Sequence, residues 1–83
     1  MKSPTTFGAR FKLLREEKGL TLEQVGKELG FIKQTISKYE KNESEPAYSD
    51  LVKIAKFFGV SIDYLLGKTD EGHWKRESYD NYR

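Results

Sequence analysis

Apolar residues recur at helical spacing along most of this chain, and short polar or glycine-containing stretches separate the groups. Phe7, Phe11 and Leu14 lie four and three residues apart, which places them on one face of a helix. A hydroxyl residue followed by proline favours a helix start, so Ser3-Pro4 predicts that this helix begins early. The first helix is therefore expected over residues 4–18.

A second helix is predicted over residues 22–29. Thr21 precedes it and Gln24 follows three residues later, which is the spacing of a capping box. A third helix is expected over residues 33–41, but Ile32 stands where a capping side chain belongs. The lack of a cap should cost about 0.5 to 2 kcal/mol relative to a capped start.

The remaining pattern predicts a polar loop and two more helices. Residues 42–46 are polar and end in a proline that blocks helix continuation. Leu51, Ile54 and Phe58 then mark a helix over residues 48–58. Ser61 is positioned to cap a last short helix that ends near Gly67. No strand pattern is present, so we expect an all-α bundle of five helices.

Two glycines indicate how the second and third helices meet. Gly26 offers a site without a side chain where two crossed helices need close backbones. Gly30 follows the last apolar residue of the second helix, where a tight turn requires positive φ. This arrangement is typical of a helix-turn-helix.

The composition favours binding over catalysis. The chain of 83 residues has no cysteine, and its single histidine, His73, lies in a polar stretch without partners for a triad or a metal site. We therefore expect no enzyme activity, no metal and no cofactor. No apolar run is long enough to span a membrane and no signal peptide is recognisable, so a cytoplasmic location is expected.

Positive charge is concentrated in the first half of the chain. Residues 1–41 have a net charge of +4, whereas residues 42–83 have a net charge of −2. The basic half contains the predicted helix-turn-helix. This asymmetry favours contact with phosphate, although a solvated charged surface would also explain it.

Residues 10–67 resemble the Cro/C1-type (Xre, phage-repressor-like) helix-turn-helix family. The resemblance rests on the segments LREEKGLT, TISKYE and KIAKFFGVSIDYLLG, on the LG turn and on the loop that ends in proline. It implies a compact five-helix domain, here residues 1–67, that binds double-stranded operator DNA as a homodimer and regulates transcription, usually as a repressor. Residues 68–83 would be a polar and aromatic tail or the start of a linker.

The third helix supplies the candidate DNA-binding residues. Ile36 and Tyr39 should point into the core, which leaves the opposite face for the major groove. By geometry and by resemblance, the predicted base-reading residues are Lys33, Gln34, Ser37 and Lys38. The predicted DNA-backbone contacts are Thr21, Thr35, Lys41 and Asn42, with a purely local structural role open for Thr35.

The resemblance also implies an ion pair and suggests a self-association surface. Arg15 and Glu40 match family positions that pair with each other, chiefly in a structural role. Phe57, Ile62 and Tyr64 are a candidate dimer patch, with plain core packing as the equal alternative.

Four residues depart from the family pattern, and one of them is Phe57, which stands where a smaller residue is usual. Leu22 stands where many members have a glutamine that binds phosphate, and Glu43 and Glu45 place negative charge in the loop after the third helix. The rival hypothesis is a protein-interaction module, such as an antitoxin, antirepressor or scaffold, on the same fold. Its contact surface would include three aromatic residues of the tail, Trp74, Tyr79 and Tyr82.

Overall fold

The computed structural model describes residues 5–70, which form five helices and no strand. The predicted all-α, five-helix fold is confirmed. Within the described residues, no helix is long and apolar enough to cross a membrane. The helices are α1 (Phe7–Glu17), α2 (Leu22–Leu29), α3 (Lys33–Glu40), α4 (Tyr48–Phe58) and α5 (Ile62–Leu65).

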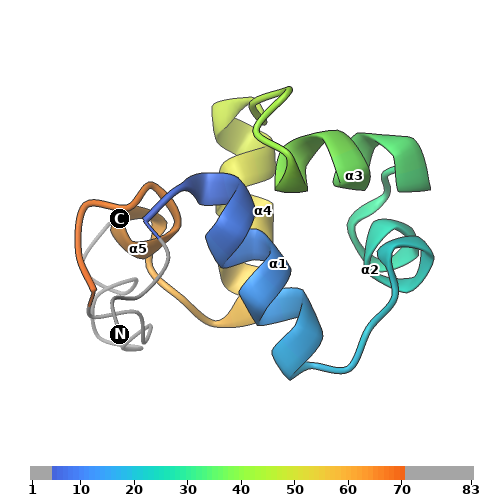
Figure 1. Ribbon diagram of the computed structural model, residues 1–83, viewed down its shortest axis with the longest axis horizontal. Coiled ribbons are helices and arrows are strands. Elements are labelled where there is room, and N and C mark those ends of the chain that lie inside the picture. Colours follow the sequence, from blue (N-terminus) through green and yellow to red (C-terminus); the bar gives the residue numbers. More distant parts are fainter. Residues whose placement is uncertain (1–4, 71–83) are drawn as a thin grey trace.

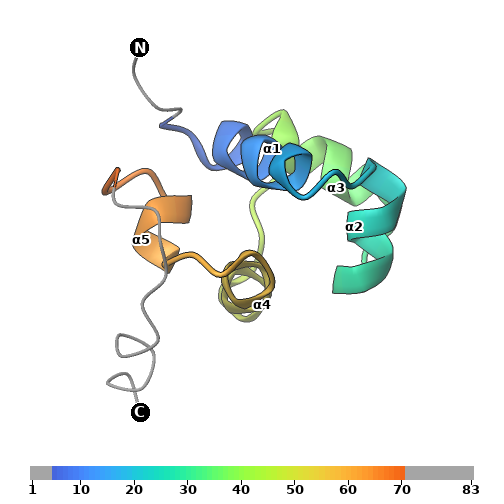
Figure 2. The same ribbon diagram turned by 90° about the horizontal axis from the view of Figure 1, so that it is seen from below.

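The five helices surround one core. Figure 1 shows α1 across the middle of the molecule, with α2 and α3 on one side and α5 on the other. In the view of Figure 2, α1 and α3 lie above α4. Every helix contributes at least one fully buried apolar side chain, so each is held by hydrophobic burial. Among these residues are Phe11, Val25, Ile36, Ile54 and Leu65.

Helix α1 begins three residues later than predicted. Its N-cap is Thr6, whose hydroxyl accepts from the N–H of Ala9 at 3.2 Å. The Asn42 side chain also accepts from the N–H of Gly8 at 2.9 Å. A contact from a distant loop therefore helps to fix this start, which local sequence cannot show. Ser3 and Pro4 lie outside the described residues.

The turn between α2 and α3 has the predicted geometry. Gly30 has φ of 84°, and the N–H of Phe31 donates to the Gly26 carbonyl at 2.7 Å. A Cβ atom on Gly26 would lie 2.5 Å from the Phe31 carbonyl oxygen. The absence of a side chain at Gly26 is therefore required by the close backbones of the helix-turn-helix.

The predicted ends of α2 and α3 are largely correct. The Thr21–Gln24 capping box is complete, with hydrogen bonds of 3.0 and 2.8 Å. Ile32 is the N-cap of α3 and provides no side-chain hydrogen bond. Helix α3 ends at Glu40, one residue earlier than predicted, and Lys41 is its C-cap.

Candidate nucleic-acid interface

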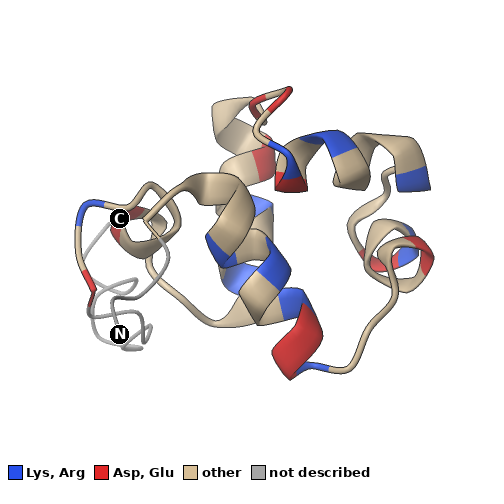
Figure 3. Ribbon diagram, in the orientation of Figure 1, with Lys and Arg blue, Asp and Glu red and all other residues tan. Residues whose placement is uncertain are grey.

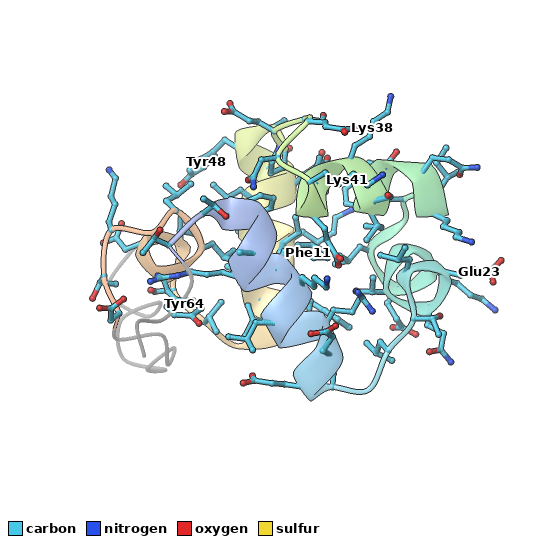
Figure 4. The ribbon with its side chains drawn as sticks, viewed as in Figure 1. Phe11, Glu23, Lys38, Lys41, Tyr48 and Tyr64 are labelled. Atoms are coloured by element: carbon cyan, nitrogen blue, oxygen red, sulfur yellow. The ribbon has the colours of Figure 1, made fainter. Side chains whose placement is uncertain are left out.

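Helix α3 divides into an inner and an outer face. Ile36 and Tyr39 are buried, as expected from their spacing. On the outer face Lys33, Gln34 and Lys38 are exposed, and Figure 4 shows Lys38 reaching away from the bundle. Of the remaining candidates on this helix, Ser37 and Thr35 are half-buried. The prediction of which face of α3 is exposed is therefore confirmed for Lys33, Gln34 and Lys38.

The cations of the outer face have no internal counter-charge. Among residues 5–70, neither Lys33 nor Lys38 forms a salt bridge. In Figure 3 the α3 ribbon is blue, the colour of Lys and Arg, at its start and again farther along the helix. Ile32, just before them, is 67% exposed. Together they form an exposed surface with two unpaired cations, an amide and an apolar side chain.

The start of α2 retains a limited capacity to bind an anion. The Thr21 hydroxyl accepts from the Gln24 N–H, but its own proton is still available to donate. Leu22 is half-buried and packs against the core, so it provides no polar side chain. Glu23 is exposed in the first turn of α2, where Figure 4 labels it. Its negative charge partly offsets the positive end of the helix dipole and so weakens the attraction for a phosphate.

The Arg15 side chain joins three parts of the fold. Its Nε lies 2.6 Å from Glu40 Oε2, and a second nitrogen lies 3.1 Å from Glu40 Oε1. A further bond of 2.8 Å runs to the Leu20 carbonyl in the turn before α2. The hydrogen bond with Glu40 raises the pKa of Arg15 above its ordinary value. This pair, expected from the sequence, fixes the end of α3 to α1 and to the entry of α2.

Two close contacts place α1 against the end of α3. A Cβ atom on Gly8 would lie 2.5 Å from the Glu40 carbonyl oxygen, so only glycine fits there without displacement. The Asn42 amide nitrogen donates to the Thr6 hydroxyl at 3.3 Å, in addition to its bond with Gly8. Asn42, a predicted contact to the DNA backbone, is exposed, and its side chain already forms hydrogen bonds with Gly8 and Thr6. Lys41 is exposed.

The loop after α3 is negatively charged at its surface. Glu43 and Glu45 are both exposed, and Figure 3 shows acidic residues in this loop beyond the end of α3. Their carboxylates would repel a phosphate placed at this end of the helix. The basic residues of the candidate interface are therefore Lys33 in the first turn of α3, Lys38 in its last turn, and Lys41 at its C-cap.

Within the candidate dimer patch, Tyr64 follows the core-packing alternative. Tyr64 is 8% exposed, because the Arg10 guanidinium covers its ring at 4.3 Å from the centroid. Phe57 and Ile62 are half-buried. Leu66, which the sequence analysis did not select, is 44% exposed and lines a pocket of about 310 Å³.

Three further residues were missed. Arg10 is fully buried, Lys53 donates to the Leu29 carbonyl at the end of α2 at 3.0 Å, and Gly8 permits the close approach to α3. For Arg10 a signal existed, since it lies three residues after Phe7 and next to Phe11 on the apolar face of the first helix. For Lys53 no local pattern would have indicated the contact.

Known proteins share both the sequence pattern and the fold. The helix-turn-helix family model matches residues 11–65. The uncharacterized HTH-type transcriptional regulator YobD of Bacillus subtilis (strain 168) is 37% identical over 62 residues, which cover 75% of this chain and 55% of YobD. This chain thus spans little more than half the length of that relative.

Solved structures of DNA complexes resemble the model. The P22 c2 repressor in complex with synthetic operator 9T has a TM-score of 0.74 at 29% identity, covering 80% of this chain and all of that one. SinR, a master regulator for biofilm formation, in complex with DNA has a TM-score of 0.66 at 31% identity, covering 72% and 97%. From its family match, its relatives and its fold, the chain belongs to the Cro/C1-type (Xre) family of helix-turn-helix proteins.

Proposed function

We propose that this chain is a sequence-specific DNA-binding transcriptional regulator that acts as a repressor. The observation that carries this proposal is the outer face of α3, where Lys33, Gln34 and Lys38 are exposed and both lysines lack a salt bridge within residues 5–70. The likeness to a repressor bound to its operator supports the same mode of action. The proposed location is the cytoplasm.

In this proposal α3 enters the major groove with its first turns against the bases. A major groove about 12 Å wide admits one helix. Lys33 and Lys38 donate to guanine acceptors, Gln34 forms paired hydrogen bonds with adenine, and Ser37 contacts an adjacent base edge. Ile32 lies where it can pack against a thymine methyl group. Thr21, Thr35 and Lys41 contact phosphates on either side.

The proposed active form on DNA is a homodimer. Two copies related by a two-fold axis would place two α3 helices in successive major grooves, so the operator would be a palindrome. Phe57 and Ile62 are half-buried and Leu66 is partly exposed, so these three apolar side chains form the proposed contact. Tyr64 is not part of it, because the ring is buried.

A gel-shift titration with promoter DNA tests the role of α3. Lys33→Ala and Lys38→Ala should each weaken binding about tenfold or more, because each removes a charged contact worth about 1 to 3 kcal/mol. The matched control is Lys56→Ala, which removes the same charge from the exposed surface near the end of α4, away from α3 in Figure 1. The protein-interaction hypothesis expects equal affinity for all three variants.

The salt dependence of the same titration provides a second check. If the dimer neutralises about six phosphates, its affinity should fall roughly 10³-fold between 50 and 200 mM salt. A nearly flat dependence would contradict phosphate contact.

Glu45→Gln should raise the affinity slightly, since the loop after α3 would repel the DNA backbone less.

A further inference from the structure

Arg10 is a residue of α1 whose side chain is fully buried and contacts α5 and the residues after it. One of its terminal nitrogens donates to the Tyr64 carbonyl at 2.6 Å and to the Thr69 carbonyl at 2.5 Å. The other contacts Asp70 Oδ1 at 2.7 Å. The guanidinium also covers the Tyr64 ring. We call this set of contacts the Arg10 clasp.

The helix that the Arg10 clasp holds cannot stand alone. Helix α5 has four residues, far fewer than an isolated helix needs to persist in water. Ser61 caps its start, and at its end the Tyr64 carbonyl accepts from Arg10. A cation at a helix C-terminus is favourable, because it meets the negative end of the dipole. Arg10 therefore stabilises α5 at the end that no capping side chain serves.

The chain after α5 folds back beside the start of α1. Gly67 has φ of 80°, and a Cβ atom there would collide with the Thr5 carbonyl oxygen. The N–H of Lys68 donates to the Asp63 carbonyl at 2.9 Å, and Thr69 and Asp70 then reach Arg10. These contacts extend through Asp70, three residues past the predicted boundary at 67.

Asp70 is the accessible half of the Arg10 clasp. Its side chain is 77% exposed, whereas that of Arg10 is fully buried. Asp70 is one of the groups that offset the buried charge of Arg10, so its removal weakens the contacts that hold the guanidinium in place. The family match covers residues 11–65, so Arg10 and Asp70 both lie just outside the part of the chain that the family model describes.

We propose that Arg10 is a positioning residue whose clasp on Tyr64, Thr69 and Asp70 sets the position of α5. Through α5 it also sets the apolar contact of Ile62 and Leu66, and so self-association depends on Asp70. This second step rests on the proposed dimer. The Arg10 clasp itself is a property of the single chain and can be tested without DNA.

Hydrogen exchange of the full chain tests the Arg10 clasp. Asp70→Asn should speed the exchange of the Gly67 and Lys68 amides about tenfold, the size expected for one charge-assisted hydrogen bond partly screened by water. The amides of α2 and α3 should not change. Asp70→Glu, which keeps the carboxylate, should restore most of the protection. Glu28→Gln on α2 is the control, since Glu28 is an exposed acid outside α5 that forms no salt bridge within residues 5–70.

Equal exchange in wild type and Asp70→Asn would overturn the Arg10 clasp. So would failure of Asp70→Glu to restore protection, because shape rather than charge would then be responsible. Sedimentation of the same variants tests the second step, for which Asp70→Asn should weaken self-association about threefold or more. An unchanged dimer with faster exchange would overturn the coupling alone. A wild-type chain that stays monomeric on palindromic DNA would overturn both the proposed dimer and its dependence on Asp70. Hydrogen exchange would still test the Arg10 clasp in that case.

Discussion

Two arginines on α1 hold its two neighbours in different ways. Arg15 binds Glu40 of α3, and both side chains are largely shielded, at 13% and 8% exposure. Arg10 binds Asp70 beyond α5, where the carboxylate faces water. The helix-turn-helix is thus attached to α1 by an ion pair shielded from water. The C-terminal end of the described residues is attached to α1 by an ion pair whose carboxylate is exposed. We infer that the first junction is rigid and the second is adjustable.

The largest expected effect comes from breaking the Arg15–Glu40 pair. Glu40→Ala should lower the free energy of unfolding by about 3 kcal/mol, because it strands a shielded guanidinium. Urea denaturation of the purified chain measures this. Glu43→Ala, an exposed acid three residues away, is the control and should change stability by less than about 0.5 kcal/mol. Unchanged stability of Glu40→Ala would show that Glu40 is not structurally important.

The close approach of α1 to α3 provides the next test of the rigid junction. Gly8→Ala should cost about 2 kcal/mol, since the added Cβ meets the Tyr39 and Glu40 carbonyl oxygens at 2.6 and 2.5 Å. Alanine has a higher helix propensity than glycine, so propensity alone would predict that Gly8→Ala stabilises the chain. Thermal unfolding is a suitable measurement, with Lys12→Ala on the same helix as control. A stabilised Gly8→Ala would mean that the junction yields easily.

Salt should distinguish the two arginine junctions. Asp70→Asn should cost about 1 kcal/mol at low ionic strength, and this cost should shrink as salt is raised to about 1 M, because the exposed carboxylate is screened. The cost of Glu40→Ala should change much less, since both partners are shielded. Urea unfolding of wild type and both variants at two salt concentrations gives the comparison. Equal salt sensitivity would remove the distinction between rigid and adjustable junctions.

The smallest expected effect is an alkaline loss of stability at the α1–α3 junction. Burial, with a smaller contribution from the charge of Asp50, raises the pKa of Tyr39 above its ordinary value. The unfolded chain therefore loses this proton first, so the stabilisation is complete below about pH 10 and declines as pH rises further. Tyr39→Phe should show a shallower decline in unfolding free energy between about pH 9.5 and 11. Parallel pH profiles would indicate that Tyr39 is not desolvated.

The sequence was most informative where one short segment determines both the contact and its geometry. Gly26, Gly30 and the Thr21–Gln24 box lie within ten residues, and the structure places all of them as predicted. The outer face of α3 followed from the spacing of Ile36 and Tyr39. The Arg15–Glu40 pair came from family resemblance rather than from the pattern of this chain.

Contacts between distant segments are what the local pattern could not show. The Asn42 side chain accepts from the Gly8 N–H, 34 residues away in the sequence, and this bond helps to determine where α1 begins. Tyr64 is buried because Arg10, 54 residues earlier, covers it. Neither contact can be predicted from the residues next to it in the sequence. For Arg10, however, its position on an apolar helix face indicated buried partners.

Selection of bound sites from random DNA is the most direct test that α3 reads an operator. The wild-type chain should enrich a palindrome whose half-sites lie about 10 bp apart, or a multiple of one helical turn. Lys38→Ala should relax the preference at the same position in both half-sites, whereas Lys56→Ala should leave the enriched sequence unchanged. A wild-type pool with no enriched sequence, or an enriched sequence unaffected by Lys38→Ala, would contradict this account.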